Sequence, residues 1–317
     1  MIRAWVGDGA AVREVSAAAA IEAAASGRSP AWIDLEGEEA EAVHTVLEPL
    51  HIHPLVLDDM VMEVNRPKVH NYGTYLYLVV HSARWDEDRP TIKEIDLVIG
   101  ERFLVSCHDG STRSISSAHT VLPRRPELLV SGPCSLVHFI LDVLVDHYLP
   151  IMDVVTEEID GLEEHLFQDA AMVAHGRILR LKRGMSALRR IVGPQRDTVL
   201  ALTRDEFRAI PAELRPYLRD VYDRLARVND LLDSFRDEVA SLLDLQVAMA
   251  SNRLNEVIKR LTVIATVGLP LTLITGYYGM NFDFGEYHFR HAWVFAVGLL
   301  LLSGLLTWWL LKRNRWL

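Results

Sequence analysis

The sequence predicts a mixed α and β protein with a large polar N-terminal part, a long helix and two membrane-spanning helices. Three observations predict this fold class. Several β-rich runs lie in the first third of the chain, an apolar stripe with helical spacing follows later, and two uncharged segments lie near the C-terminal end. The chain has 317 residues, of which 50% are hydrophobic, enough for one sizeable core and a membrane part.

Two uncharged segments have the length of a bilayer crossing. Residues 261–279 read LTVIATVGLPLTLITGYYG, and residues 292–311 read AWVFAVGLLLLSGLLTWWLL. About 20 apolar residues in a helix cross the hydrocarbon core of a membrane. The alternative is a buried helical hairpin of a soluble protein, but two adjacent uncharged segments followed by KRNRWL favour the membrane.

Basic residues flank these segments on one side. Lys259 and Arg260 precede the first segment and residues 312–317 follow the second, whereas the loop at residues 280–291 has Arg290 alone among Lys and Arg. The positive-inside rule then places both termini in the cytoplasm and the loop outside. The N-terminus has no sustained apolar core and does not resemble a signal peptide. We expect a multi-pass protein of the cell inner (plasma) membrane.

The chain is acidic, with 43 Asp and Glu, 33 Lys and Arg, and a net charge of −10. This charge makes nucleic acid a poor partner and suits the attraction of cations, although ordinary solubilising charge explains it equally well. Cys107 and Cys134 are isolated thiols without metal-ligand spacing. The sequence has no phosphate-binding loop, HExxH pattern or nucleophile elbow, so we expect neither an enzyme nor an organic cofactor.

The N-terminal part reads as a mixed α/β domain, followed by helices. The β-rich runs are residues 30–37, 73–85, 91–100 and 102–108. Turn-like residues separate the last three, so these runs are expected to pair antiparallel. One long helix is expected over residues 135–167, with Pro150 as a site for a kink. A second helix follows and is expected to end at Gly193 and Pro194.

A third helical segment is expected to be very long. Proline is absent between Pro216 and Pro270, and apolar residues recur in steps of three and four, at Leu225, Val228, Leu232, Phe235, Val239 and Leu242. A helix continued to Gly279 has about 60 residues and a length of roughly 90 Å. We expect such a helix to bury its stripe against the same helix of identical subunits around an axis.

The two uncharged segments differ in composition. The second is nearly all Leu, Val, Trp and Ala, which suits contact with lipid. The first also contains small and hydroxyl residues, namely Thr262, Thr266, Gly268, Thr272, Thr275 and Gly276. These residues suit either close helix packing without a pore or a wet lumen, and we interpret the first segment as an inner ring.

The first segment ends in a polar stretch. Gly279 is expected to end the helix in a left-handed conformation, with Asn281 tolerant of similar geometry. In an oligomer, Asn281 forms a ring of neutral amides, which suits Mg²⁺ because this ion gives up its water reluctantly. Asp283 and Glu286 lie just beyond and are expected to concentrate cations by their charge.

Several motifs resemble one known family. The stretch YGMNF at residues 278–282, with LNEVIKRLTVIAT and RDVYDRL before it and HPLVLDDM and RPKVHNYGTYLYLVV far upstream, is similar to the CorA family of divalent-cation channels. The resemblance covers essentially the whole chain. It implies a homopentamer with a cytosolic α/β/α funnel, a stalk helix that continues into the pore helix, and a second membrane helix outside it.

The resemblance also implies a division of the chain and a set of pore residues. The expected parts are a cytosolic α/β domain 1–134, a helical hairpin 135–217, a stalk 218–260, a pore helix 261–279, an external loop 280–291, a second membrane helix 292–311 and a basic tail 312–317. The selectivity filter is expected at Gly279, Met280 and Asn281. The deeper pore lining is expected at Thr272, Leu269, Leu261 and Ile258, whose apolar members suit a hydrophobic gate.

In the family, intracellular Mg²⁺ held between neighbouring subunits closes the pore. The resemblance implies that Asp220 is one ligand of such a regulatory site, and Asp86 and Asp88 are the candidates for its partner. One departure concerns the ion: a Met-Pro-Glu-Leu element usually follows Gly-Met-Asn, whereas this chain has FDFGEYHFRH. His288 and His291 in that stretch are ligands that also suit Zn²⁺, Co²⁺ or Ni²⁺, or they are ordinary interfacial histidines.

Three functions therefore stay open. The first is a passive Mg²⁺ influx channel, which also admits Co²⁺ or Ni²⁺ and is gated by intracellular divalent cation. The second is a ZntB-like Zn²⁺ transporter, coupled or not to protons. The third, from another class, is a membrane sensor that conducts no ions. Membrane lipid and divalent cations are the expected partners in the first two cases, with Mg²⁺ both transported and regulatory in the first.

Overall fold

The computed structural model describes residues 1–62, 65–86, 89–167, 171–207, 209–280, 291–314 and 316. Of Met62, Phe167, residues 171–174 and Ala292, only the backbone is described. The chain divides into two compact units, Met1–Leu243 and Asp244–Leu317.

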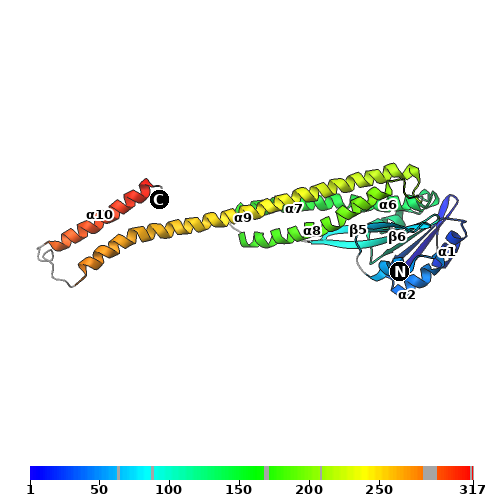
Figure 1. Cartoon of the computed structure of the whole chain (residues 1–317), viewed down its shortest axis with the longest axis horizontal. Coiled ribbons are helices and arrows are strands. Elements are labelled where there is room, and N and C mark those ends of the chain that lie inside the picture. The colour runs from blue at the N-terminus through cyan, green and yellow to red at the C-terminus, as the bar shows by residue number, and fades with distance from the viewer. Residues whose placement is uncertain are drawn as a thin grey trace. The chain divides into compact units, whose positions relative to one another are not determined.

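A mixed sheet forms the centre of the first unit (Figure 1). Within the described residues it has seven strands in the order β2-β1-β3-β7-β6-β5-β4. The strands are β1 Ile2–Asp8, β2 Ala11–Val15, β3 Ala31–Glu36, β4 Lys68–Asn71, β5 Tyr75–Asp86, β6 Arg89–Gly100 and β7 Phe103–His108. Neighbouring strands pair antiparallel except β3 and β7, which are parallel and pair Asp34 with Ser106.

The β-rich runs predicted from the sequence are confirmed as β3, β5, β6 and β7, and the last three pair antiparallel as predicted. Their apolar residues are buried on both faces, as expected for strands in the middle of a covered sheet. The strands β1, β2 and β4 and the helix α1 (Ala17–Ala25) were not predicted. The exposed strand β2 and the four-residue strand β4 carry little of the hydrophobic pattern that identifies a strand.

Helices cover both faces of the sheet and complete a three-layer α/β/α arrangement. Among the described residues, the remaining helical elements are α2 Ala40–Leu47, η1 Glu48–Leu50, α3 Pro54–Met62, α4 Arg113–Val121, α5 Glu127–Val130, α6 Pro133–Asp146, α7 Tyr148–Phe167, α8 Ala171–Leu202, η2 Ala212–Leu214, α9 Arg215–Tyr278 and α10 Ala292–Arg313. One face of the sheet packs against α1, α2 and α3 in a core that includes Ile33, Leu47, Val56 and Tyr77. On the other side, α6, α7 and α8 contact β5 and β6.

Two helix boundaries differ from the prediction. Residues 135–167 do not form one helix, because α6 and α7 are separated at His147. Pro150 accounts for the break, since a proline ring clashes with the carbonyl group four residues earlier, here that of Asp146. The expected helix end at Gly193 and Pro194 is also wrong, because α8 continues through both. Tertiary contacts hold this part of α8: the side-chain oxygen of Gln195 accepts a 2.7 Å hydrogen bond from the backbone N–H of His81.

The apolar stripe of α9 is buried within a single chain. Its six residues, Leu225, Val228, Leu232, Phe235, Val239 and Leu242, are all 6% exposed or less. Polar contacts flank the stripe: Arg189 of α8 lies 2.9 Å from Asp233, and Arg224 pairs with Asp142 of α6. The expectation that identical subunits are needed to bury this stripe is therefore wrong. Helices of the same subunit bury it instead.

Candidate membrane and ion-pathway site

Exposed apolar side chains cover both helical segments of the second unit. On α9 they include Leu254, Val257, Ile258, Leu261, Ile264, Leu269 and Leu273, and on α10 they include Trp293, Phe295, Leu301, Leu302, Leu305, Leu306, Trp308 and Trp309. Soluble monomers rarely expose contiguous apolar surface of this extent. Near the end of α10, Lys312 and Arg313 lie over the rings of Trp308 and Trp309, an arrangement that suits a membrane interface. The second unit is therefore suited to contact with lipid or with other chains.

Three described helical stretches are long and apolar enough to cross a membrane. They are Pro133–Leu166, Ala212–Tyr278 and Trp293–Arg313. The most apolar windows of the last two are 0% and 6% buried, whereas that of the first is 44% buried. The first stretch comprises α6 and α7, which pack against the sheet, so its apolar character is explained by the core of the first unit.

Threonine hydroxyl groups on the apolar part of α9 donate hydrogen bonds to their own helix. Thr262 Oγ1 donates to the carbonyl of Ile258 at 2.8 Å, Thr272 Oγ1 to that of Gly268 at 2.8 Å, and Thr275 Oγ1 to that of Leu271 at 2.9 Å. Each hydroxyl has one hydrogen and two lone pairs. With the hydrogen used by the helix, each oxygen offers only lone pairs to its surroundings, and such an acceptor suits the water shell of a cation.

Pro270 lies inside α9 and adds another acceptor. Proline has no backbone N–H, so the carbonyl of Thr266 four residues earlier has no partner of the usual helical kind. Four positions of the predicted pore face, Ile258, Leu261, Leu269 and Thr272, fall within about 80° of the helix circumference at 3.6 residues per turn. All four are exposed in the single chain, but so are residues on other faces of α9, and exposure alone does not single out this face.

The end of α9 differs from the expected cap. Gly279 is not in the left-handed region, and its N–H donates to the carbonyls of Thr275 and Gly276 at 2.9 and 3.2 Å. A Cβ atom at Gly279 would lie 3.1 Å from the carbonyl oxygen of Thr275. Close approach to the preceding turn, rather than a positive φ, is therefore what favours glycine at this position. Met280 is half exposed directly after it.

The remaining residues of the expected pore mouth lie outside the described residues. Asn281, Asp283, Glu286 and His288 all fall in the range 281–290. His291 is described, and it is the exposed residue that precedes α10 as its N-cap.

The acidic residues expected in a regulatory site have other partners within one chain. Asp220 on α9 lies 3.1 Å from Arg224, which also pairs with Asp142 and Asp146. Asp86 at the end of β5 pairs with Arg84 at 2.7 Å and accepts a 2.6 Å hydrogen bond from Thr91. Asp88 lies outside the described residues. No group of three His, Cys, Asp or Glu side chains in the described part of the chain is arranged to hold a metal ion.

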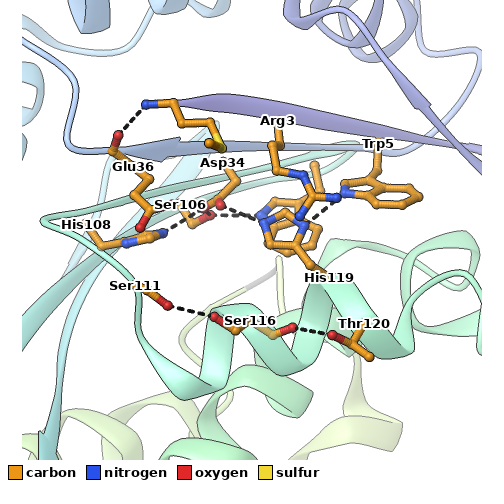
Figure 2. A network of polar contacts seen from close by, with 12 residues as sticks. Arg3, Trp5, Asp34, Glu36, Ser106, His108, Ser111, Ser116, His119 and Thr120 are labelled. Atoms are coloured by element: carbon orange, nitrogen blue, oxygen red, sulfur yellow. Dashed lines mark hydrogen bonds and ion pairs between the residues drawn. The ribbon is translucent and has the colours of Figure 1, made fainter.

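Sequence reasoning missed a buried polar network in the first unit. Asp34 of β3 lies 2.7 Å from His119 Nε2 and 3.2 Å from His108 Nε2, and Ser106 donates a hydrogen bond to it (Figure 2). Although burial favours the neutral acid, the hydrogen bonds from His108 and His119 hold the pKa of Asp34 at about 2. The indole N–H of Trp5 donates to the other nitrogen of His119 at 3.0 Å. The network ties α4 to three strands, and its members are too far apart in sequence to form a motif.

A second buried acid was also missed. The Tyr77 hydroxyl donates a 2.6 Å hydrogen bond to Asp96, and Lys68, Asn65 and Glu94 lie in the same cluster. Burial, with the negative charge of Glu94, raises the pKa of Asp96 to about 8. Asp96 is therefore largely protonated at neutral pH.

The fold and the exposed apolar helices define a membrane protein with a large α/β/α domain. Residues 27–313 match the family model described as "CorA-like Mg2+ transporter protein", and the chain belongs to this family. It is thus a member of a family of metal ion transporters rather than of an enzyme class. The resemblance expected from the sequence is confirmed.

The relatives of this chain are named as transporters of different metal ions. The chain is 30% identical over 284 residues to the "Putative metal ion transporter YfjQ" of Bacillus subtilis, covering 89% of this chain and 88% of the relative. It is 30% identical to the "Cobalt/magnesium transport protein CorA" of Thermotoga maritima, covering 91% and 84%. It is 28% identical to the "Zinc transport protein ZntB" of Cronobacter sakazakii, covering 91% and 88%.

Solved structures share the fold over the whole chain. The complete structure of the CorA magnesium transporter from Methanocaldococcus jannaschii matches with a TM-score of 0.86 at 18% identity, covering 100% of this chain and 99% of that one. The full-length CmaX protein matches with a TM-score of 0.77 at 19% identity, covering 99% and 97%. At these identities the likeness concerns the fold, which includes the mixed sheet and the long helix.

Proposed function

We propose that the chain is one subunit of a homopentameric channel through which Mg²⁺ enters the cell down its electrochemical gradient. The observation that carries this proposal is the apolar part of α9, where exposed apolar residues alternate with hydroxyl oxygens and the helix ends at the Gly-Met-Asn sequence. Membership of the family and the relative named as a cobalt/magnesium transport protein support Mg²⁺, with Co²⁺ and Ni²⁺ as further substrates.

Several copies of α9 are needed to enclose a pathway, because a single helix has no lumen. The exposed apolar residues beyond Asp244 provide the surface that neighbouring subunits cover. The hydroxyl hydrogen of Thr272 is donated to the carbonyl of Gly268. In this arrangement its Oγ1 atom accepts hydrogen bonds from the water shell of the ion. Gly279, Met280 and Asn281 form the selectivity filter at the outer end.

The apolar rings deeper in the pathway serve as the gate. Ile258, Leu261 and Leu269 share the helix face of Thr272, and their side chains cannot replace the water of an ion. A narrow ring of this kind stops ions when it is dry and passes them when it widens and fills with water. The face is thus divided between acceptors that bind the hydrated ion weakly and apolar rings that decide whether it passes.

Charge and orientation favour inward movement. We place both termini in the cytoplasm of a cell whose plasma (inner) membrane the chain crosses twice, by α9 and α10. Asp283 and Glu286 then lie at the outer mouth and raise the local cation concentration. A membrane potential contributes about 2.3 kcal/mol per elementary charge and 100 mV, and a divalent ion carries two charges.

Regulation comes from a site between subunits. Asp220 of one subunit and Asp86 or Asp88 of its neighbour hold intracellular Mg²⁺ and keep the pore closed. In a single chain Asp220 is paired with Arg224, and Asp86 with Arg84. The ion therefore competes with these arginines, which limits its affinity and allows closure to follow the Mg²⁺ concentration.

The decisive experiment measures divalent uptake by the full chain in proteoliposomes. We expect Mg²⁺ uptake without a pH gradient, lowered at least roughly 10-fold by Asn281→Ala, since each subunit loses one amide contact with the hydrated ion. Asn314→Ala, at the far end of α10, is the matched control and should keep the wild-type rate. Uptake that both variants leave unchanged would contradict the filter, and no flux at all would support a membrane sensor.

The second candidate is a Zn²⁺ transporter. It is favoured by the relative named as a zinc transport protein, by His291 before α10 and by the absence of Met-Pro-Glu-Leu after Gly-Met-Asn. Zn²⁺ uptake that follows an imposed pH gradient, with Mg²⁺ not transported, would establish this function in place of the first.

A further inference from the structure

A cavity of about 280 Å³ lies in the first unit, beside the start of α4. Residues of β5 and β6, the segment that leads into α4, and the helices α6 and α7 line it. One wall is cationic and consists of Arg84, Lys93 and Arg113. The other wall is apolar and includes Leu144, Ile151 and Val154.

The charge of this cavity is opposite to that of the chain. The net charge of the protein is −10, yet no Asp or Glu is among the described residues that line the cavity. Lys93 Nζ donates to the carbonyl of Ser111 at 3.0 Å and has no ion pair with the described residues, while Arg84 is paired with Asp86. Arg113 is exposed as the first residue of α4. The cavity is therefore a local positive site in an acidic protein.

The start of α4 supplies further donors. Thr112 is its N-cap residue, but its side chain makes no capping hydrogen bond, so the first N–H groups of the helix do not have the acceptor that an N-cap side chain usually supplies. The hydroxyl groups of Thr112 and Ser114 are buried and have no hydrogen-bond partner in the described part of the chain, and the two residues are only 3% and 1% exposed. Both residues line the cavity. Buried hydroxyl groups normally have hydrogen-bond partners, so two buried hydroxyl groups without partners at this position indicate a missing ligand.

The neighbouring hydroxyl groups bond to other atoms and are not partners of Thr112 and Ser114. Ser111 and Ser116 lie 3.0 Å apart and bond to each other, and Thr120 donates to the carbonyl of Ser116 (Figure 2). These contacts hold the first turns of α4 in place and leave Thr112 and Ser114 for a ligand in the cavity.

We propose that this cavity binds a small organic phosphate, with the phosphate group against Lys93, Arg113 and the start of α4 and the organic part against the apolar wall. A phosphate monoester carries a charge of about −1.5 to −2 and three acceptor oxygens, which match two cations and several N–H and O–H donors. Trp85, which also lines the cavity, offers a flat apolar surface to a ring. The proposal concerns the first unit alone and does not depend on ion transport.

Calorimetric titration of the full chain in detergent micelles tests the proposal with three probes. Phenyl phosphate carries both the charge and an apolar ring, inorganic phosphate carries only the charge, and phenol carries only the ring. We expect saturable binding of phenyl phosphate, binding of inorganic phosphate about 10-fold weaker, and no binding of phenol. Equal affinities of phenyl phosphate and inorganic phosphate, or tight binding of phenol, would overturn the proposed division into two walls.

Charge-removing variants locate the site. Lys93→Gln and Arg113→Gln should each weaken phenyl phosphate binding about 10-fold, as expected for the loss of a charge-assisted hydrogen bond. Arg190→Gln, an exposed position on α8 outside the cavity, is the matched control and should bind like the wild type. Arg113 is exposed, so its variant is expected to fold even if Lys93→Gln does not. Wild-type affinity in Arg113→Gln, or an equal loss in Arg190→Gln, would overturn the proposal.

Discussion

The Nε2 atom of His119 lies 2.7 Å from Oδ2 of Asp34, across a separation of 85 residues in the sequence. This contact joins α4 to strand β3 in the interior of the sheet, and the ring of His119 also stacks on Trp32 with the ring centroids 4.2 Å apart. A buried carboxylate between two histidines is stable only while its charge is compensated.

The first prediction concerns Asp34→Asn. Removal of one partner from a buried charged network typically costs about 3 to 5 kcal/mol. The variant should therefore unfold at a clearly lower temperature than the wild type at pH 6, measured by circular dichroism of the full chain in detergent. Asp8→Asn, an exposed acid paired with Arg13 on the neighbouring strand, is the control and should change the unfolding temperature little. A similar unfolding temperature in both variants would contradict the structural role of Asp34.

The same network predicts a pH dependence. The pKa of Asp34 is lowered to about 2, so its stabilising contribution is present above the unfolded pKa of 3.8 and is lost as the pH falls toward 2. Burial lowers the pKa of His108, but its bond to Asp34 prevails and raises it above 6.5. The stabilising contribution of His108 is present below pH 6.5 and is lost as the pH rises through the raised pKa of His108. In Asp34→Asn both dependences should disappear from the unfolding temperature, and their persistence would assign them to other groups.

Asp96→Asn should have the opposite effect. The pKa of Asp96 is raised to about 8, so the wild type loses stability as the pH rises from 3.8 to 8, by at most about 1.4 kcal/mol per pH unit. Asn stays neutral and can still accept the hydrogen bond from Tyr77. The variant should match the wild type near pH 4 and exceed its stability at pH 8. The check is denaturant unfolding at both pH values, and a variant that is less stable at pH 8 would show that Asp96 is needed as the ionised acid.

The buried stripe of α9 gives a fourth prediction. Leu232 is 1% exposed, so Leu232→Ala should destabilise the first unit by about 2 to 5 kcal/mol. Leu55 on α3 of the first unit is 64% exposed, and Leu55→Ala is the matched control. Denaturant unfolding followed by circular dichroism compares the two. An equal loss in both variants would contradict the burial of Leu232 in the core of its own chain.

Local patterns predicted much of the fold. The runs that became β5, β6 and β7 were predictable because each strand and its neighbour are separated by a short turn, and the stripe from Leu225 to Leu242 identified a helix from its spacing alone. The partner of that stripe was not predictable, because spacing shows that a face is apolar without showing what covers it. The Asp34 network also escaped detection, since its members Ser106 and His119 meet Asp34 only through the parallel pairing of β3 and β7 and the placement of α4.

The candidate ion pathway was predictable to a smaller extent. The exposure of Leu261 and Leu269 agrees with a helix face that lipid or other chains cover, but the same is true of Leu273, so the choice of the pore face depends on family resemblance. Gly279 was expected to end the helix in a left-handed conformation. Instead it allows the chain to pass close to the carbonyl of Thr275, a contact that the sequence pattern does not reveal.

The fifth prediction concerns the regulatory site and Arg224. This arginine pairs with Asp142, Asp146 and Asp220, so it opposes any cation that Asp220 helps to hold. Under the proposed function, Arg224→Gln should close the channel at an intracellular Mg²⁺ concentration several-fold lower than in the wild type. Asp220→Asn should leave the channel open at concentrations that close the wild type. Mg²⁺ uptake into proteoliposomes preloaded with graded Mg²⁺ measures both, and Arg236→Gln, an exposed arginine paired with Asp237, is the control. A shift in the same direction for the Arg224 and Asp220 variants would indicate that both act through the stability of the first unit rather than through a bound ion.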